Sequence, residues 1–210
     1  MQFSYFKQIS SKIKKIELPG LDAQLLLAPE FRKKSLAFDF DLVKAKKAGV
    51  LILFYPDADG QTYFTLILRK SYKGVHSAQV ALPGGKIEKQ DENLTDTALR
   101  ETEEEIGVDA SAVEVLKALT ELYIPPSNFL VKPIVGVVDN TPKFIKEDSE
   151  VELIIPVKLD DFLNAKPERG EIVTSYAGRK EVMCFKINGY IVWGATAMIL
   201  SELREIFRKI

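Results

Sequence analysis

The feature that most constrains this chain is a short helix whose last turns are crowded with acids. Four glutamates occupy those turns just before a glycine: Glu101, Glu103, Glu104 and Glu105. The crowding breaks two local rules, because acids belong near helix N-termini and like charges three or four residues apart destabilise a helix by about 0.2–0.5 kcal/mol per pair. No lysine or arginine follows within a turn to compensate. A segment that breaks local rules in this way is expected to serve a function.

On a helical wheel at about 100° per residue, three of these acids form one patch on adjacent turns. Glu105 lies about 40° to one side of Glu101, and Glu104 lies about 60° to the other side. Glu103 points elsewhere, into solvent. A separate sector is expected to face the core and holds Thr95, Leu99, Thr102 and Ile106.

Three converging carboxylates repel one another unless a cation lies among them. Oxygen ligands alone select a hard ion such as Mg²⁺ or Mn²⁺ rather than zinc. Such an ion usually keeps several waters and is completed by substrate phosphates. We therefore expect Glu101, Glu104 and Glu105 to bind a divalent metal; the alternative is a solvated acidic face on a surface helix.

A glycine pair precedes the helix and supports the same interpretation. Gly84 and Gly85 allow the backbone to adopt positive φ and to come close to a ligand. A loop that leads into a helix can offer N–H groups to phosphate oxygens or a carbonyl to a metal. Two adjacent glycines on their own are more often a plain turn, so the pair gains meaning from the acids that follow.

The whole segment resembles the signature of the Nudix family, known as the Nudix box. That signature has a glycine, a spacer, an acid and a second spacer, followed by Arg-Glu-x-x-Glu-Glu-x-Gly and an aliphatic residue. Its second half is matched from Arg100 to Val108. The first half is one residue longer than the general pattern, so the acid falls on Asp91 when counted from Gly85 and on Glu92 when counted back from the arginine.

The resemblance extends over about residues 48 to 200. It implies the α/β (α+β) class, with a Nudix-type α/β/α sandwich and a mixed sheet. A chain of 210 residues, 46% of them hydrophobic, is long enough for one domain with a sizeable core. We expect an N-terminal helix and arm over residues 1–47, packed on a Nudix hydrolase domain over residues 48–210.

Apolar runs and turn residues predict the elements of that domain. The expected strands are 50–55, 63–68, 113–122, 130–138, 152–157, 183–187 and 190–193. The expected helices are one from Asn93 or Thr95 to Ile106, and others over 159–163 and 197–210. A polar segment over 139–150 suggests a long mobile loop, and Asn188-Gly189 is the dipeptide favoured in a tight hairpin.

Residues upstream of the glycines point to a subfamily. The segment 68–85 resembles the additional signature of coenzyme A pyrophosphatases, in which an arginine is followed by a histidine and then by Phe-Pro-Gly-Gly. This chain has Ala78 where a glycine is usual and Leu82 where a phenylalanine is usual. The resemblance implies Mg²⁺- or Mn²⁺-dependent cleavage of coenzyme A or acyl-CoA to 4′-phosphopantetheine and adenosine 3′,5′-bisphosphate.

Roles follow for individual side chains. A carboxylate that accepts the proton of the attacking water would be Glu101 or an acid of the 139–150 loop; the loop offers Glu147, Asp148 and Glu150. Arg100 would pair with a carboxylate and fix the helix, unless it forms only a surface salt bridge. The candidate catalytic residues are Glu101, Arg100 and Glu104, and the candidate substrate-binding residues are Arg69, His76, Gly84 and Gly85.

Four residues just before the glycines could together hold an additional phosphate, such as the 3′-phosphate of coenzyme A: Arg69, Lys70, Lys73 and His76. A lone histidine is more often structural than a ligand, but the match of His76 to the coenzyme A pyrophosphatase signature puts the two roles on an equal footing. Two other functions stay open: hydrolysis of ADP-ribose, NADH or another nucleotide, and a Nudix-fold sensor that binds a nucleotide without cleaving it. Sensors of that kind usually carry a DNA-binding domain or a damaged box, and this chain has neither.

The expected partner is a small nucleotide diphosphate. A net charge of −1 leaves no broad basic field for nucleic acid, and no uninterrupted apolar run reaches the length of a stable membrane span. The single cysteine, Cys184, excludes an internal disulfide framework, and the start of the chain lacks the features of a signal peptide. These features predict a cytoplasmic protein.

Residues 1 to 16 form a basic amphipathic pattern. Apolar residues repeat at helical spacing, and four lysines occur with no acid among them. Such a helix can lie on a membrane surface or bind a partner. The alternative, which we favour, is that it docks on its own domain or on the second subunit of a homodimer.

Overall fold

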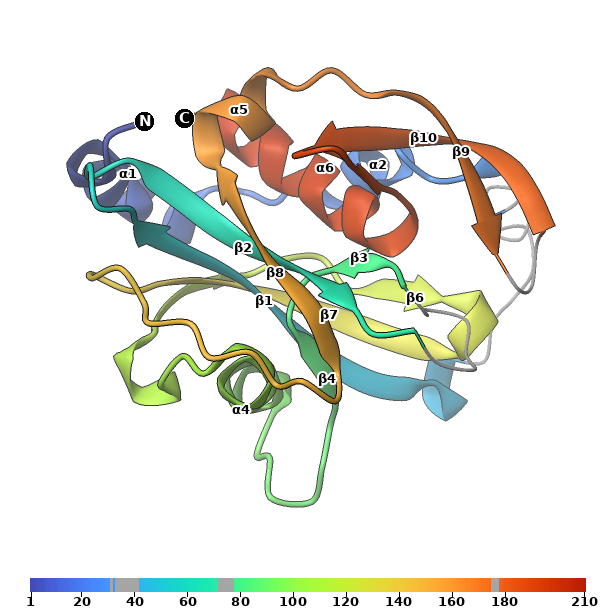
Figure 1. The fold of residues 1–210 in the computed structure, drawn as a ribbon, viewed down its shortest axis with the longest axis horizontal. Helices are drawn as coiled ribbons and strands as arrows, with labels where there is room; N and C mark the ends of the chain where they lie inside the picture. Colours follow the sequence, from blue (N-terminus) through green and yellow to red (C-terminus); the bar gives the residue numbers. More distant parts are fainter. Residues whose placement is uncertain (31, 33–41, 72–77, 175–177) are drawn as a thin grey trace.

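The structure is a computed structural model that describes residues 1–30, 32, 42–71, 78–174 and 178–210. A mixed sheet lies between two layers of helices, as Figure 1 shows. Strand β1 (Lys46–Pro56) runs parallel to β7 (Phe129–Val137), and the other pairings in this sheet are antiparallel. The predicted α/β/α sandwich with a mixed sheet is confirmed.

The main sheet has the strand order β3-β2-β1-β7-β5, with β4 paired to β1, β6 to β7 and β8 to β2. Its further strands are β2 (Thr62–Arg69), β3 (Val80–Ala81), β4 (Gly84–Lys86), β5 (Glu114–Ala118), β6 (Leu122–Ile124) and β8 (Val151–Lys158). A second sheet has the order β11-β10-β9, formed by β9 (Glu168–Thr174), β10 (Gly178–Ile187) and β11 (Tyr190–Val192).

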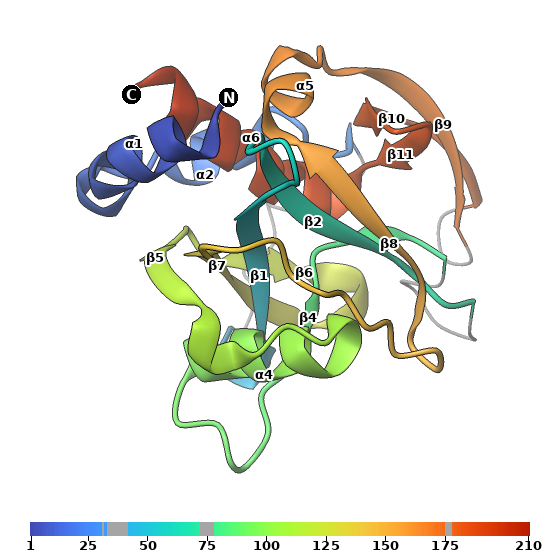
Figure 2. The same ribbon diagram turned by 60° about the vertical axis from the view of Figure 1, so that its left-hand side comes forward.

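Helices cover both faces of the main sheet, and Figure 2 shows α4 on one side and α1, α2 and α6 on the other. The helices are α1 (Phe3–Lys15), α2 (Gly20–Leu25), α4 (Leu94–Ile106), α5 (Leu159–Asn164) and α6 (Gly194–Arg208). The described residues also form short 3₁₀ turns: η1 (Leu42–Lys44) precedes β1, η2 (Ala110–Ala112) lies between α4 and β5, and η3 (Pro125–Ser127) joins β6 to β7. No helix among the described residues is both long and apolar enough to cross a membrane.

Strand β1 explains why two cores form. Ile52 and Phe54 pack into the core beneath α1 and α6, whereas Leu51 and Leu53 pack into the core beneath α4. Alternate residues of a strand point to opposite faces, so a strand covered on both faces reads as a continuous apolar run. The central strand predicted at 50–55 is therefore confirmed.

One predicted strand is wrong in its extent. The run 113–122 splits into β5 and β6, because Ala118 pairs with Ile134 and Leu122 pairs with Val131. Four steps along this segment thus face three steps along β7. Pro133 lies opposite the break; it has no N–H to donate to the ladder, although its carbonyl accepts the N–H of Leu119 at 2.8 Å. A register irregularity lies within β5 itself, between Val115 and Lys117.

The N-terminal helix docks on its own domain. Phe6 is fully buried, and its ring centroid lies 4.7 Å from that of Phe54. Lys7 and Lys14 each bind Glu114 of β5, at 2.9 and 2.8 Å. The apolar face of α1 therefore packs within its own domain, which is one of the alternatives that the basic amphipathic pattern of residues 1–16 left open.

The expected loop over 139–150 contains no regular element until it reaches β8, but it is anchored rather than loose. Phe144 packs edge-on against Tyr55, with ring centroids 5.2 Å apart. The backbone N–H of Ile145 donates to the carbonyl of Ile106, at 2.9 Å, at the C-terminal end of α4. The loop therefore follows the helix that carries the acids.

Candidate active site

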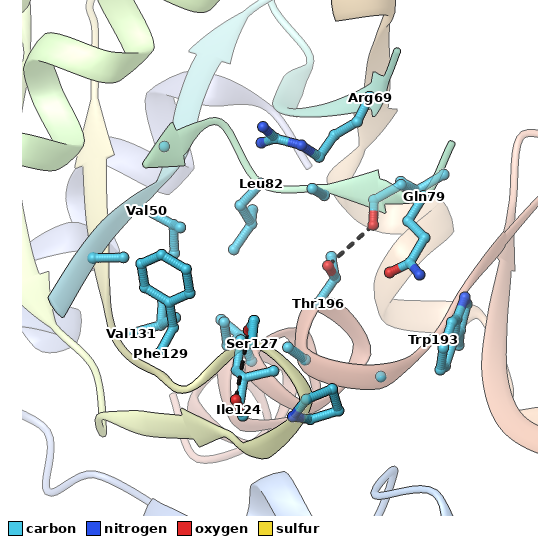
Figure 3. A pocket seen from close by; sticks show the side chains of 18 of the residues that line it. Val50, Arg69, Gln79, Leu82, Ile124, Ser127, Phe129, Val131, Trp193 and Thr196 are labelled. Carbon is cyan, nitrogen blue, oxygen red and sulfur yellow. Dashed lines mark hydrogen bonds between the residues drawn. The ribbon is translucent and has the colours of Figure 1, made fainter. Parts of the chain in front are cut away.

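A cleft of about 760 Å³ lies between the main sheet, the start of α6 and the η3 turn. Figure 3 shows Arg69 at its upper rim, Val50 and Phe129 on one wall, and Thr196 and Trp193 toward the opposite side. Among the acids of the box, Glu101 lines this cleft from α4, and both predicted glycines line it from β4.

The glycine pair lies against the backbone of β1 on one side and against the Glu101 side chain of α4 on the other. Gly84 and Gly85 form β4 and pair antiparallel with Val50 and Gly49 of β1. At Gly84 φ is +142°, and a Cβ there would lie 2.3 Å from the carbonyl oxygen of Gly49. A Cβ on Gly85 would lie 2.3 Å from Oε2 of Glu101. Side chains at these positions would displace either the strand or the carboxylate.

The helix that carries the acids is held at both ends. Asn93 caps its start, and the side-chain oxygen accepts hydrogen bonds from the N–H groups of Thr95 and Asp96, at 2.8 and 3.2 Å. Gly107 ends it in the left-handed region, with φ +72° and its N–H bonded to the carbonyl of Glu103 at 2.8 Å. The predicted helix from Asn93 or Thr95 to Ile106 is confirmed.

Glu105 lies on the buried face of α4 and is 2% exposed. Its carboxylate accepts the N–H of Gly84 at 2.8 Å and the Nη1 of Arg69 at 3.3 Å. Burial raises the pKa of Glu105 to about 7, while the Arg69 charge and the Gly84 N–H oppose that rise. The acid therefore joins three elements, because it connects α4 to β4 and β2.

This burial corrects the helical-wheel expectation. The buried face of α4 holds Ala98, Thr102 and Glu105, whereas Leu99 is only partly buried. The helical wheel gives the correct angular positions of the acids and apolar residues. It wrongly implies, however, that the acidic patch and the core-facing sector are separate. In the structure the core side includes an acid, because Gly84 supplies a backbone donor directly opposite Glu105.

Glu101 and Glu150 line the cleft from two different elements. Burial is the main cause that raises the pKa of Glu101; Arg100 opposes it, and the charges of Glu104 and Glu150 add to it. Glu150 likewise raises the pKa of Glu105. Carboxylates from α4 and from the turn just before β8 are therefore close enough to repel one another.

The loop offered three acids, and their positions differ. Glu147 accepts the N–H and the hydroxyl of Ser149, at 3.0 and 2.8 Å, within its own turn. Asp148 is 87% exposed and pairs with Lys146. Of the three, Glu150 is the acid that lines the cleft.

Arg100 points to the other side of α4 and binds Asp91 with two hydrogen bonds. Nε lies 2.8 Å from Oδ1 and Nη2 lies 3.0 Å from Oδ2. The Arg100 guanidinium holds the pKa of Asp91 well below its usual range. The backbone N–H of Glu88 and the hydroxyl of Thr97 also donate to this carboxylate. The acid that the sequence left between two positions is therefore Asp91; Glu92 is exposed.

Glu104 lies apart from the other two predicted metal ligands. It is 56% exposed, and its carboxylate accepts the Nη1 of Arg100 at 2.8 Å. Glu101 and Glu105 reach the glycines, whereas Glu104 stays on the outer side of the same helix. A ligand role for Glu104 requires its side chain to leave Arg100, and that role stays a prediction.

No group of three acids, histidines or cysteines within the described ranges lies close enough as it stands to hold a metal ion. The donor set nevertheless fits a hard divalent cation. Glu101, Glu105 and Glu150 supply only oxygen, and the first two have pKa values raised in part by neighbouring carboxylates. A bound cation would relieve that repulsion.

The predicted substrate residues are found in part. Arg69 lines the cleft, and its Nε has no hydrogen-bond partner in the part of the chain that the structure describes. His76 lies outside the described residues. The apolar wall was missed, because its members come from segments far apart in sequence and carry no motif: Val50, Leu82, Ile124, Phe129, Val131 and Ile199.

Solved structures with the same architecture support the fold assignment. RenU, a Nudix hydrolase from M. smegmatis, aligns with a TM-score of 0.53 at 16% identity, over 79% of this chain and 88% of that chain. The NUDIX domain of Shewanella oneidensis NrtR, solved with ADP ribose, aligns with a TM-score of 0.51 at 16% identity, over 83% of this chain and 97% of that chain. These similarities show an α+β Nudix fold with a mixed sheet and flanking helices.

Sequence comparison then gives the family. The NUDIX domain model matches residues 45–175. Nudix hydrolase 15, mitochondrial, of Arabidopsis thaliana is 36% identical over 178 residues, covering 81% of this chain and 62% of that protein. A Yersinia enterocolitica protein named "Uncharacterized Nudix hydrolase NudL" is 36% identical over 143 residues, covering 67% of this chain and 73% of its own length. The chain belongs to the NUDIX family.

The chain spans less than two thirds of the plant relatives. It covers 62% of Nudix hydrolase 15 and 56% of Nudix hydrolase 22, chloroplastic, which is 35% identical over 170 residues.

Proposed function

We propose that this protein is a Nudix pyrophosphohydrolase that uses Mg²⁺ or Mn²⁺ to hydrolyse a diphosphate linkage in a nucleotide. The observation that carries the proposal is the approach of Glu101, Glu105 and Glu150 to one another beside the glycines of β4. Such a concentration of carboxylates around a cleft has a clear use in holding a cation against phosphate.

Glu101 and Glu105 would hold the cation together with Glu150, and Glu104 would join them if it leaves Arg100. When bound, the cation supplies charge neutralisation at the phosphoryl oxygens and lowers the pKa of a water. Glu105 is kept in place by the Gly84 N–H and by Arg69, and Glu101 is kept in place against Gly85. The carboxylates are therefore oriented before substrate arrives.

Glu101 or Glu150 would accept the proton of the attacking water. A carboxylate near a cation is a weak base unless it is poorly solvated or has acidic neighbours. Burial and Glu150 both raise the pKa of Glu101. Arg100 acts as a positioning residue, because it binds Asp91 on one side and lies 3.0 Å from a Glu101 oxygen on the other.

The preferred substrate is coenzyme A or acyl-CoA, cleaved to 4′-phosphopantetheine and adenosine 3′,5′-bisphosphate. The signature over 68–85 supports this choice. The cleft adds a second argument, because its apolar wall beyond the acids suits an uncharged chain attached to the diphosphate. Arg69 and His76 are the residues proposed to meet an additional phosphate.

One assay distinguishes coenzyme A hydrolysis from two alternative functions. The second candidate is hydrolysis of ADP-ribose or NADH; ADP-ribose is the ligand in the NrtR domain structure, which is similar to this chain in fold alone. A non-catalytic nucleotide sensor is the third. Coenzyme A, ADP-ribose and NADH are incubated side by side with Mg²⁺ and Mn²⁺. Faster cleavage of coenzyme A supports the proposal, equal or faster cleavage of ADP-ribose selects the second candidate, and binding without cleavage selects the sensor.

The proposed setting is the cytoplasm, with a small nucleotide as the partner and no role for nucleic acid. Cys184 is buried and free, which suits a reducing compartment. A homodimer stays a prediction, which the mass of the protein in solution would test.

A further inference from the structure

A further buried acid lies on α6, outside the set of residues that line the cleft. Glu202, on α6, is 0% exposed. It accepts hydrogen bonds from Thr120 Oγ1 at 2.6 Å, from Gln24 Nε2 at 2.8 Å and from the N–H of Gly20 at 3.2 Å. No lysine or arginine among the described residues forms an ion pair with it. Burying a carboxylate is costly unless donors replace its water, so these donors hold Glu202 in place.

The three segments that meet at Glu202 also build one side of the cleft. The N-terminal arm contributes Pro29 and Arg32. Helix α6 contributes Ala195, Thr196 and Ile199, and the segment that follows Thr120 contributes Ile124 and the η3 turn. We call this side, formed by the arm, the start of α6 and residues 124–127, the distal wall.

Further hydrogen bonds join the arm to the same segment. Gln24 Nε2 also donates to the carbonyl of Thr120 at 2.9 Å, and Arg32 Nη2 donates to the carbonyl of Tyr123. Two points of the arm are thus bonded to the backbone that leads into the distal wall. Glu202 adds α6 to this connection.

The distal wall differs in chemistry from the acidic side. Its lining includes Pro29, Ile124, Pro125, Ala195 and Ile199, and it contains none of the carboxylates proposed to hold metal. Its cation, Arg32, is 7% exposed and donates to the carbonyl of Tyr123. The arm and α6 also lie outside residues 45–175, the part matched by the family model. The wall is therefore suited to the uncharged part of a substrate rather than to its diphosphate.

We propose that Glu202 is a positioning residue that fixes the distal wall and thereby sets the affinity for the uncharged, largely apolar arm of the substrate. The inference rests on the proposed function for the identity of that substrate. Glu202 touches neither the substrate nor the metal; it acts through Gln24 and Thr120.

The test replaces Glu202 by Gln, which keeps the shape but exchanges one acceptor oxygen for a donor that faces other donors. The matched control is Glu205→Gln, one turn along α6, which removes only a partly exposed contact with Arg208. For Glu202→Gln we expect the KM for coenzyme A to rise about fivefold or more while kcat stays within about twofold. For the control, both constants stay within about twofold of the wild type.

A second readout does not depend on turnover. Hydrogen exchange of backbone amides over residues 119–129 is expected to be faster in Glu202→Gln than in Glu205→Gln. If Glu202→Gln does not fold, Thr120→Val removes a single donor and is judged by the same criteria. A lower melting temperature with KM and exchange unchanged overturns the inference. If the wild type cleaves no diphosphate, the proposed function fails and the exchange rates alone decide the inference.

Discussion

Arg100 and Asp91 are joined by two hydrogen bonds, of 2.8 and 3.0 Å, and this pair ties α4 to the loop that precedes it. The side chain of Asp91 is 2% exposed, so the pair is screened from water on its acid side. Arg100 also lies 3.0 Å from a Glu101 oxygen. An arginine turned away from the cleft therefore orders the loop and limits the freedom of an acid that lines the cleft.

Asp91→Asn is expected to lower the free energy of unfolding by about 2 kcal/mol, because the charge-assisted hydrogen bonds to Arg100 weaken. Glu92→Gln is the control, since Glu92 is exposed, and it should change that free energy by less than about 0.5 kcal/mol. Urea unfolding of both variants provides the measurement. Equal effects at the two positions would contradict the assignment of Asp91.

Glu105→Gln is expected to lower kcat at least about a hundredfold, because it removes a charge proposed to hold the cation. The control is Glu103→Gln on the exposed side of the same helix, which should keep activity within about twofold. Steady-state rates at saturating Mn²⁺ provide the measurement. Unchanged turnover in Glu105→Gln would exclude its proposed role.

Glu150→Gln is expected to lower kcat by about ten- to a hundredfold, because the substitution removes either a proton acceptor or a metal ligand. Asp148→Asn, two residues earlier in the same loop, should have little effect, since that side chain is 87% exposed. Rates across a range of Mn²⁺ concentrations separate the two roles, because a lost ligand raises the metal requirement. Loss of activity in Asp148→Asn instead would show that the wrong loop acid has been chosen.

Without metal, the protein is expected to lose stability as the pH rises from about 4.5 to about 7. Glu105 has its pKa raised from 4.5 to about 7 in the folded protein, so the folded state binds the proton more tightly than the unfolded state. Stability therefore falls as that proton is lost, by about 3 kcal/mol in total. Urea unfolding in EDTA at several pH values measures this loss.

Glu105→Gln cannot ionise and should remove most of this pH dependence. The wild type with Mn²⁺ should show the opposite trend, because the cation binds the deprotonated acid. A metal-free wild type whose stability rises over the same pH range would contradict the burial-driven shift.

Much of the fold could be predicted from local sequence signals. The α4 helix follows from Asn93, Gly107 and its apolar spacing, and the hairpin between β10 and β11 follows from Asn188-Gly189, whose φ values are +49° and +82°. These signals act over a few residues and need no tertiary contact. They therefore fix the helix and the position of the hairpin turn, whereas the start of β10, at Gly178 rather than at residue 183, was not predicted.

The site could be predicted only in part. A helical wheel does not show which side of a helix packs on the sheet. The burial of Glu105 and the exposure of Glu104 could therefore not be predicted, because they result from the packing of β4 against α4. The distal wall depended on contacts such as Gln24 with Glu202, which are 178 residues apart and carry no shared motif. Contacts of that kind follow from the packed structure rather than from local spacing.

Gly49 of β1 controls how closely α4, and with it every acid of the box, packs against the sheet. A Cβ there would lie 2.1 Å from the carbonyl oxygen of Leu94, so the first turn of α4 rests on a residue that offers only a hydrogen atom. The packing distance between the helix and the sheet therefore depends on the absence of a side chain at residue 49. A single methyl group at residue 49 would lift the helix as a unit and carry its carboxylates away from β4, although no charged group would have been altered.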